Sequence, residues 1–492
     1  MAKTESGNAA AGRALSGVAA DSRETVTSRR GGKPAAQKNE EFNLTIEDMS
    51  DDGSGIGRRT GFVWFVKDTV VGDVVRVRVT KVLKSYGYAR LMKIITPSRH
   101  RVPEPCPAAH ECGGCTLQML DYREQLRMKQ EKVLNALTRI GGIPADEIKM
   151  KPIFGMDNPW RYRNKALFPI GKSRDGRIIA GFYAARSHRI VECGDCLLGV
   201  RENQKILRVI LDFLEEYGIE PYDEETGKGL VRHVLIRKGF SSGELLACLV
   251  INGRSLPHSG DLVSRLMLIP GMKSISLSVN TARTNVVMGK EILPLAGEPY
   301  IEDSIAGVRY RISPLSFYQV NPVQTEKLYG TALSYADLKG GETVWDLYCG
   351  IGTISLFLAR KAGKVRGVEI VPDAVRDARA NAELNHMENV EFFAGKAEEV
   401  LPREYREHGE KADVIVVDPP RKGCDRALLD TMIRMAPKRI VYVSCNPSTL
   451  ARDIRILAGE GGYRLKKVRC CDMFPMGMHV ETVVLMSRIK EK

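Results

Sequence analysis

The stretch Thr343-Val-Trp-Asp-Leu-Tyr-Cys-Gly-Ile-Gly-Thr353 determines how we expect the last third of this 492-residue chain to fold. Its first five residues form a short, mainly apolar run that predicts a buried strand, and a helical pattern begins after its glycines. Glycines in such a turn let the backbone approach a ligand closely, and the amides that open the following helix face that ligand. The sequence therefore predicts a ligand-binding turn that includes Gly350, Gly352 and Thr353.

Further strand patterns follow this turn, separated by helical stretches. They are Gly367-Val-Glu-Ile, Asn389-Val-Glu-Phe-Phe, Ala412-Asp-Val-Ile-Val-Val and Arg439-Ile-Val-Tyr-Val. The alternation predicts a doubly wound parallel sheet of the Rossmann-like, seven-stranded methyltransferase type, which we assign to residues 311–492. The last two strands, residues 463–471 and 479–486, leave no room for a helical crossover, so we expect them to be antiparallel.

Acidic residues at the ends of the predicted strands indicate which ligand the turn would bind. Glu369 ends the second strand, where a carboxylate would hold the hydroxyl groups of a ribose. A nicotinamide cofactor is one interpretation, but the third glycine of Gly-x-Gly-x-x-Gly is absent, and the acid Asp346 ahead of the turn fits S-adenosylmethionine better. Asp418-Pro-Pro-Arg421 ends the fourth strand. Amino-methylating enzymes have a similar motif, but they carry an aromatic residue where Arg421 stands.

Cys445 and Glu481 are the two candidate catalytic residues. Cys445 follows the strand 439–443, just before Asn446-Pro447 ends the ladder, and ligands bind outside the carboxyl ends of strands in open α/β sheets. Considered alone, Cys445 would more often be a small buried hydrophobe. Glu481 interrupts the apolar residues 480–484, where a carboxylate is costly unless it faces a pocket.

The overall composition limits the class of protein. Lys and Arg outnumber Asp and Glu by 74 to 60, which suggests a polyanionic partner. We find neither an apolar run long enough to span a membrane nor a signal peptide, so we expect a cytoplasmic protein. Eleven cysteines in a large intracellular chain favour metal ligation or catalysis over disulfides. Residues 1–40 have almost no large apolar residue and predict a disordered basic tail.

Residues 41–99 alternate apolar and polar residues in short runs separated by turns. This pattern predicts a five-stranded barrel of the oligonucleotide-binding kind. The stretch resembles a TRAM domain, in which Gly-x-Gly and a later Val-x-Gly-Asp are typical, here Gly53-Ser54-Gly55 and Val71-Gly72-Asp73. TRAM domains bind RNA, although the barrel could also be a packing unit only.

Residues 100–310 predict a central α+β domain that carries a cysteine-ligated metal centre. Cys106, Cys112 and Cys115 are spaced to wrap one soft metal centre, and the fourth ligand would be Cys193 or Cys196. Four thiolates suit both zinc and an iron–sulfur cluster. The rest of the domain predicts helices at 121–139 and 204–217 and strands at 230–236, 245–251, 274–279 and 285–287.

The run Trp160-Arg-Tyr-Arg-Asn-Lys165 interleaves aromatic and basic residues. Such a run suits stacking on bases and contact with phosphates, which makes Arg161, Arg163 and Lys165 candidate RNA contacts. An exposed strand is an equally good interpretation.

Five motifs occur in an order that resembles the RNA uracil-5-methyltransferases. They are Phe317-Tyr-Gln319-Val-Asn-Pro, Asp346-Leu-Tyr-Cys-Gly-Ile-Gly, Asp418-Pro-Pro-Arg-Lys-Gly, Ser444-Cys445-Asn446-Pro447 and His479-Val-Glu481-Thr. With the TRAM-like barrel and the cysteine spacing, the resemblance is closest to the subgroup that methylates 23S ribosomal RNA and carries a four-iron, four-sulfur (4Fe-4S) cluster. It covers residues 41–492.

The resemblance implies a role for each motif. C5 of uracil is a poor nucleophile, so a thiolate must first add to C6; this would be Cys445, with Glu481 as the base that removes the C5 proton. Phe317 becomes a candidate to stack on the flipped target base. Cys196, which precedes an apolar pair, fits the fourth cluster ligand better than Cys193. The implied S-adenosylmethionine contacts are Gln319, Tyr348, Glu369, Asp418 and, where the family often has Asn, Thr353.

We therefore expect a monomeric enzyme that forms 5-methyluridine in 23S ribosomal RNA and binds neither DNA nor a membrane. Methylation of transfer RNA stays open, because the catalytic motifs do not exclude it. A non-enzymatic RNA-binding or ribosome-assembly factor is a third interpretation, against which the intact Cys445 and Glu481 argue.

Overall fold

The computed structural model describes residues 36–489, so the predicted disordered tail, residues 1–40, lies almost entirely outside the described residues. The chain divides into two compact units. One comprises the described residues up to Ser50 together with Ser54–Ser98, and the other comprises Asp51–Gly53 and the chain from Arg99 onward. None of the described helices combines the length and apolar character needed to cross a bilayer.

The first unit is a small β structure whose strands follow the spatial order β1-β5-β6-β4-β3-β2. The sequence predicted five strands, and the sixth described strand is the two-residue β2. Trp64 is fully buried at the centre, with Phe42 edge-on to its ring at 5.2 Å. Gly87 is required beside it, because an added Cβ would lie 2.3 Å from the Trp64 ring. The strands are β1 Glu41–Thr45, β2 Asp48–Met49, β3 Gly55–Arg59, β4 Phe62–Val66, β5 Val74–Val82 and β6 Tyr86–Thr96.

The second unit contains a central sheet of order β10-β9-β8-β11-β12-β13-β14. Its core strand β12 is buried along its whole length, and α2 and α3 bury apolar side chains in the same core. The predicted strand at 285–287 is wrong, because these residues are mostly exposed and the outer strand forms at β14 instead. The strands are β8 Lys165–Lys172, β9 Ile178–Tyr183, β10 Ile190–Glu192, β11 Val231–Lys238, β12 Leu245–Ile251, β13 Met272–Val279 and β14 Glu291–Gly297.

The predicted doubly wound sheet is present, with the described strands in the order β19-β18-β17-β20-β21-β23-β22-β7. The five strands from β19 to β21 are parallel, and β23 is antiparallel to both β21 and β22, as predicted. The sheet also includes β7, which pairs parallel with β22 and for which the sequence predicted no strand. The strands are β7 Met150–Phe154, β17 Thr343–Leu347, β18 Lys364–Glu369, β19 Val390–Ala394, β20 Val414–Val417, β21 Arg439–Ser444, β22 Tyr463–Cys471 and β23 Glu481–Arg488.

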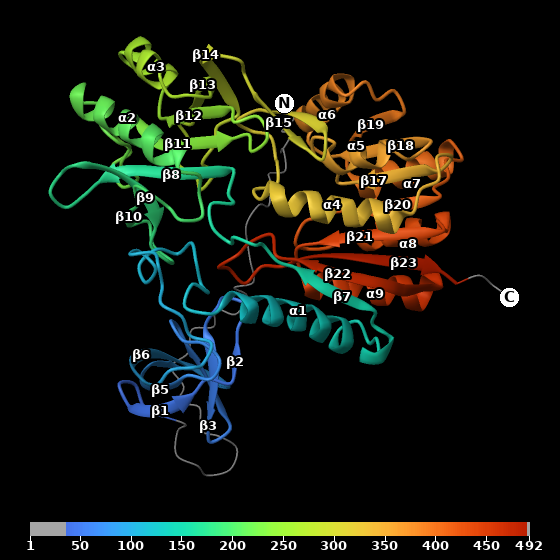
Figure 1. The fold of residues 1–492 in the computed structure, drawn as a ribbon, viewed down its shortest axis with the longest axis horizontal. Coiled ribbons are helices and arrows are strands. Elements are labelled where there is room, and N and C mark those ends of the chain that lie inside the picture. The colour runs from blue at the N-terminus through green and yellow to red at the C-terminus, as the bar shows by residue number, and fades with distance from the viewer. Residues whose placement is uncertain (1–35, 490–492) are drawn as a thin grey trace, which may run out of the picture. The chain divides into compact units, whose positions relative to one another are not determined.

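Helices cover both faces of this sheet (Figure 1). Alternate residues of β21 point to opposite faces: Val441 and Val443 pack with α4, α5 and α6, while Ile440 and Tyr442 pack with α1, α7, α8 and α9. The predicted helix at 121–139 is confirmed as α1, whose N-cap is Asp121. The helices are α1 Tyr122–Arg139, α2 Glu202–Glu216, α3 Ser259–Met267, α4 Pro322–Ala336, α5 Thr353–Ala359, α6 Pro372–Leu384, α7 Ala397–Glu407, α8 Arg426–Met435 and α9 Pro447–Gly461. A one-turn helix, Ala145–Glu147, and a hairpin of β15 Ile301–Ile305 and β16 Val308–Ile312 complete the unit.

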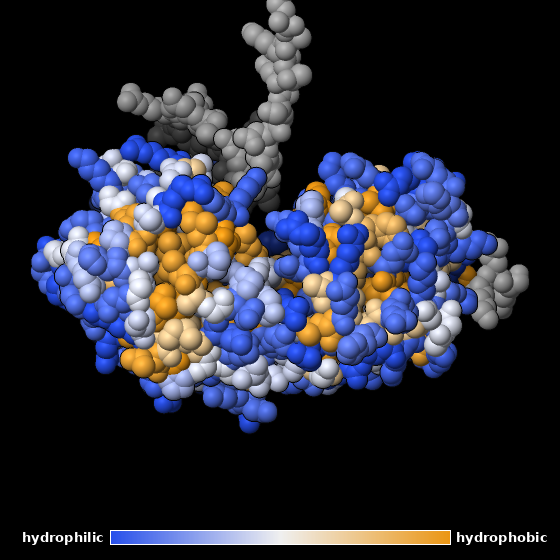
Figure 2. All heavy atoms as spheres, turned by 90° about the horizontal axis from the view of Figure 1, so that it is seen from above, coloured by the Kyte–Doolittle hydropathy of each residue, from blue (hydrophilic) through white to orange (hydrophobic). Residues whose placement is uncertain are grey.

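Apolar side chains gather on the left half of the face seen in Figure 2, on the side where α3, β13 and β14 lie in Figure 1. Leu268, at the end of α3, is 83% exposed, and β14 is one of the two outer strands of its sheet. Pro294 lies within β14, and a proline in an outer strand discourages pairing with another chain.

Candidate active site

A pocket of about 1170 Å³ opens at the carboxyl ends of β17, β18, β20 and β21. This is the edge of a doubly wound sheet at which ligands bind. Each of these strands contributes residues through its last position or the turn that follows. Eight of the predicted site residues line this one pocket: Phe317, Gln319, Tyr348, Gly350, Glu369, Asp418, Cys445 and Glu481.

The strand register explains why Cys445 and Glu481 meet. Ser444 pairs with Thr482 in the antiparallel ladder between β21 and β23. Cys445 is the next residue after Ser444, and Glu481 is the residue before Thr482, so the two stand opposite each other at the end of the ladder. Asn446 then caps α9 by accepting from the Ser448 amide at 3.0 Å. Cys445 is therefore held between the end of a strand and the start of a helix.

Burial and two neighbouring carboxyl groups disfavour the thiolate of Cys445. Burial, followed by the charges of Glu481 and Asp418, raises the pKa of Cys445 to about 11. Arg421 acts in the opposite direction and lowers this pKa. The thiol therefore needs its proton removed, or its charge compensated, before it can act as a nucleophile.

Glu481 is buried and Asp418 is partly buried, and the charge of Asp418 acts on Glu481. Burial and the charge of Asp418 raise the pKa of Glu481 to about 8, and Arg421 again opposes the shift. Burial raises the pKa of Asp418 to about 6. A carboxyl group with a pKa near neutrality can both take and release a proton, which is the property required of a catalytic base.

The other end of the pocket suits an adenosyl group. The two oxygens of Glu369 accept from the amides of Gly350 (3.1 Å) and Val371 (2.9 Å), which fixes the carboxylate at the end of β18. Ile370 and Val371 line the pocket beside it and are 55% and 49% exposed. An apolar surface next to a fixed carboxylate fits the adenine and ribose of S-adenosylmethionine.

Gly352 and Thr353, predicted as ligand contacts, do not line the pocket. The Thr353 hydroxyl instead bonds the hydroxyl of Tyr329 at 3.1 Å. A Cβ added at Gly352 would lie 3.0 Å from Phe392, so this glycine permits close packing of the turn. Among the turn's glycines, Gly350 alone faces the ligand space.

Sequence reasoning missed several residues of the pocket. Glu398 accepts from the Tyr348 hydroxyl at 2.7 Å, and its place in the first turn of α7 carries no motif. Phe474 also lines the pocket, with its ring 6.1 Å from that of His479. His479 is part of the motif that contains Glu481, so the sequence offered a signal for it. Phe474 lies in a loop before β23 that has no recognisable pattern.

A second cavity, of about 440 Å³, is lined by five cysteines. The thiols are close enough to influence one another: burial, and then the charges of Cys196 and Cys106, raise the pKa of Cys112. In the described part of the chain, no three His, Cys, Asp or Glu side chains are arranged so that they could hold a metal ion. The five cysteines nevertheless line one cavity together. They are Cys106, Cys112, Cys115, Cys193 and Cys196.

The predicted RNA contacts between Trp160 and Lys165 lie beside this cysteine cavity. The Arg161 guanidinium is occupied by Asp195 and by the carbonyls of Cys196 (3.0 Å) and Gly199 (3.2 Å), so it holds the segment that carries Cys196. Arg163 and Lys165 line the cavity itself. Burial lowers the pKa of Lys165 to about 8.

Two family models match this chain. The tRNA (uracil-5-)-methyltransferase family matches residues 290–489, and the TRAM domain matches residues 35–92. The chain is 49% identical over 450 residues to a protein of Halalkalibacterium halodurans described as an uncharacterized RNA methyltransferase. The match covers 91% of this chain and 97% of that protein. A protein of Clostridium tetani with the same description is 47% identical, over 93% of this chain and 98% of its own length.

One solved structure is similar over nearly the whole chain. It is the Pyrococcus abyssi tRNA (uracil-54, C5)-methyltransferase in complex with S-adenosyl-L-homocysteine. The two chains are 28% identical with a TM-score of 0.73, and the match covers 90% of this chain and all of that one.

Proposed function

We propose that this chain, a member of the RNA uracil-5-methyltransferase family with an N-terminal TRAM domain, acts on a uridine of 23S ribosomal RNA. Like its family, it uses S-adenosylmethionine to methylate C5 of uracil in RNA. We assign the nucleophile to Cys445 and the base to Glu481. The observation that supports this assignment most is the strand register, which brings this thiol and this carboxyl group to one end of a ladder inside a single pocket.

The proposed reaction begins when the Cys445 thiolate adds to C6 of the target uracil. The electron pair of the C5–C6 double bond moves onto C5, in conjugation with the O4 carbonyl, which makes C5 nucleophilic. When bound, S-adenosylmethionine supplies an electrophilic methyl group for this carbon. Glu481 then removes the C5 proton, the electron pair re-forms the C5–C6 double bond, and Cys445 leaves as a thiolate.

The other residues that line the pocket divide between cofactor and base. We propose that Gln319, Tyr348, Glu369 and Asp418 hold S-adenosylmethionine, since all four line the pocket that contains the fixed Glu369 carboxylate. Phe317 is 69% exposed and lines the same pocket. An exposed phenyl ring at the mouth of a pocket suits stacking on a base that has been flipped out of its helix.

We also propose that the cysteine cavity holds a 4Fe-4S cluster. A tetrahedral zinc site brings four thiolates to one ion, whereas a cluster keeps its four thiolates apart by the width of the iron–sulfur core. The cysteines line one cavity of about 440 Å³, which offers both the thiols and the space that such a core needs. We assign the ligands to Cys106, Cys112, Cys115 and Cys196.

Transfer RNA is the second candidate substrate. The solved tRNA (uracil-54, C5)-methyltransferase matches 90% of this chain, so an enzyme that acts on transfer RNA shares most of this architecture. The extra barrel and the cysteine segments therefore favour ribosomal RNA less than the sequence alone suggested.

The substrate is tested with the purified protein, labelled S-adenosylmethionine and separate transcripts of 23S ribosomal RNA and transfer RNA. We expect 5-methyluridine at a defined position of the 23S transcript, mapped by mass spectrometry of nuclease fragments. Methylation of the transfer RNA alone would establish the second candidate and overturn the first. Cys445→Ala, assayed in parallel, controls for a contaminating enzyme.

A further inference from the structure

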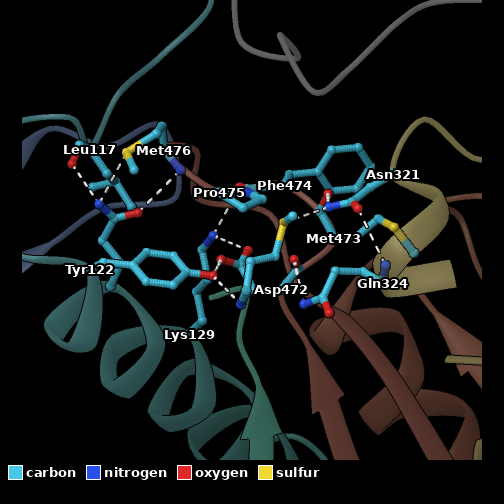
Figure 3. Close-up of polar contacts among 12 residues, drawn as sticks. Leu117, Tyr122, Lys129, Asn321, Gln324, Asp472, Met473, Phe474, Pro475 and Met476 are labelled. Atoms are coloured by element: carbon cyan, nitrogen blue, oxygen red, sulfur yellow. Dashed lines mark hydrogen bonds and ion pairs between the residues drawn. The ribbon is translucent and has the colours of Figure 1, made fainter. Parts of the chain in front are cut away.

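The loop between β22 and β23 begins with five residues, 472–476, which we call the clamped segment. Figure 3 shows side chains from α1 and α4 converging on it from two sides. Nearly every hydrogen-bonding group of its backbone is used. The Asp472 amide donates to the Phe154 carbonyl at 2.9 Å, and the Tyr162 hydroxyl donates to the Pro475 carbonyl at 3.1 Å. A loop held in this way cannot move as a free surface loop does.

On the α1 side the segment is held by a buried ion pair. Lys129 Nζ donates to Asp472 Oδ1 at 2.6 Å and to the Phe474 carbonyl at 3.0 Å, and both charged side chains are fully buried. The Tyr122 hydroxyl donates to the other carboxylate oxygen at 2.9 Å and accepts from the Met156 amide at 2.9 Å. Burying two charges is expensive, and an apolar pair of similar volume is often as stable or more so. Stability alone therefore does not account for this pair.

On the α4 side two amide side chains donate hydrogen bonds to the clamped segment. Gln324 Nε2 donates to the Asp472 carbonyl at 3.0 Å, and Asn321 Nδ2 donates to the Met473 carbonyl at 3.2 Å. The segment ends at Met476, whose φ of 66° is in the left-handed region that non-glycine residues rarely adopt. Its amide donates to Gln125 Oε1 at 3.2 Å, and its carbonyl accepts from the Thr116 amide at 2.9 Å. Strain of this kind persists only where the surroundings fix it, and it is common near active sites.

The clamped segment leads directly into the active-site pocket. Phe474, in its middle, and His479, three residues beyond its end, both line the pocket with Cys445 and Glu481. His479 Nε2 lies 3.4 Å from an Arg421 nitrogen, so this wall also meets the cation that lowers the pKa of Cys445. Glu481 follows on the same stretch of chain. The contacts on residues 472–476 therefore fix where one wall of the pocket stands relative to the nucleophile.

We propose that Lys129, Tyr122 and Asp472 are positioning residues for methylation. They hold the clamped segment so that Phe474 and His479 form the wall against which the target base meets Cys445. This inference rests on the proposed function of Cys445 as the nucleophile. A displacement of about 1 Å in such a wall can slow a reaction by about a hundredfold without weakening the binding of the cofactor.

Two variants separate positioning from stability. Lys129→Met alone leaves the Asp472 carboxylate buried without its partner, so it should both destabilise the protein and slow the reaction. Lys129→Met/Asp472→Leu replaces the pair with apolar groups, which should restore the melting temperature. The double variant still lacks the bonds to the Phe474 carbonyl and to Tyr122. Its reaction should therefore stay slow, by about a hundredfold if the wall shifts by about 1 Å.

The measurement is the rate at which Cys445 captures an RNA that carries 5-fluorouridine, together with the affinity for S-adenosylmethionine. Fluorine at C5 cannot be removed as the proton is, so the covalent adduct accumulates. We expect slow capture and unchanged cofactor affinity in the double variant. The control is Lys132→Met. Lys132 lies on the same helix as Lys129 but forms a more exposed pair with Asp51, so this variant should behave as wild type.

Each outcome decides the inference. If the double variant regains both stability and the wild-type capture rate, the network is structural only and the inference is overturned. If its stability is not restored, Tyr122→Phe decides, because it removes one hydroxyl: slow capture at an unchanged melting temperature supports positioning, and wild-type capture overturns it. If the wild-type protein itself captures no fluorinated RNA, the result contradicts the proposed role of Cys445 as nucleophile and not the positioning role of Lys129, Tyr122 and Asp472.

Discussion

Cys445 lies beside two carboxyl groups whose negative charges oppose the thiolate that it has to become. It contacts the target base and not the cofactor in the proposed reaction. Cys445→Ala should therefore abolish methylation while S-adenosylmethionine still binds with wild-type affinity. Calorimetric titration of the cofactor and a methylation assay check the two halves of this prediction. Turnover retained in the variant would remove Cys445 from the mechanism.

Glu481→Gln should stop the reaction after methyl transfer, because a neutral amide cannot take the C5 proton. The expected product is a methylated RNA still joined to Cys445 through C6. Denaturing electrophoresis should reveal this adduct as a slowly migrating band that carries the methyl label. Release of free 5-methyluridine RNA at the normal rate would mean that another group is the base.

The stability of Glu481→Gln relative to wild type should increase as the pH rises. The pKa of Glu481 is near its usual 4.5 in the unfolded chain but about 8 in the folded one, because burial and Asp418 disfavour its charge. Between these values the unfolded chain ionises first, so wild type loses stability as pH rises from about 4.5 to about 8. Glu481→Gln escapes this loss. Denaturant melts at several pH values should show its advantage growing across that window, and a constant difference would contradict the shifted pKa.

Arg421 is the cation that favours charge on both catalytic groups, since it lowers the pKa of Cys445 and of Glu481. Replacing it with Met should shift the pH dependence of adduct formation to higher pH. The Arg421 carbonyl, which accepts from Asn446 Nδ2 at 3.1 Å, is kept in this variant. Arg426→Met, which removes an exposed arginine bonded to Asp430 and Glu460, is the matched control. An unshifted profile in Arg421→Met would leave the thiol's activation to another group.

At the scale of elements, the two segments around the cysteine cavity contain five thiols for four proposed cluster positions. A hydrogen bond from Cys193, followed by the backbone amides of Leu198 and Gly199, lowers the pKa of Cys196 to about 6, which favours its thiolate. Cys196→Ser should therefore lose the brown colour of anaerobically purified protein, whereas Cys193→Ser should keep it. Iron and sulfide should each be about four per chain in the protein that keeps the colour. Loss of colour only in Cys193→Ser would move the fourth ligand, and zinc without sulfide would refute the cluster.

Some elements could be predicted from the sequence and others could not. The strands β17 to β21 are short apolar runs between helical patterns, and the end of each strand fixes where a motif residue must stand, so most pocket residues were found. The strand expected at 285–287 failed because exposed β-branched residues had no neighbouring strand to pair with. The assignments of Gly352 to the cofactor and of Arg161 to RNA stay predictions; in the structure Gly352 lies close to Phe392, and Arg161 donates to the Cys196 carbonyl. The hydrogen bond between Tyr122 and Asp472 joins residues about 350 positions apart in the sequence, and no local pattern reveals such a contact.

At the scale of the whole molecule, the catalytic sheet depends on residues from the first third of the chain. β7 pairs with β22, and α1 buries Val133 and Leu137 in the core beneath the sheet. A fragment of residues 311–492 would expose an unpaired strand edge and leave Asp472 buried without Lys129. We expect it to aggregate and to bind no S-adenosylmethionine. A fragment of residues 99–492 should melt cooperatively and bind the cofactor; the reverse result would show that the sheet folds without its early segments.

The ion pair between Lys129 and Asp472 also determines how early the newly made protein can complete its fold. The two residues are 343 positions apart, so at synthesis rates of about 5–20 residues per second the ribosome needs roughly 17–70 s to make the second after the first. Throughout that interval Lys129 has no Asp472 to pair with, and the edge of β7 has no β22 beside it and is open to other chains. The nascent chain can therefore complete its catalytic pocket only after Asp472 and Glu481 have emerged, so a chain that ends before Asp472 should modify no RNA.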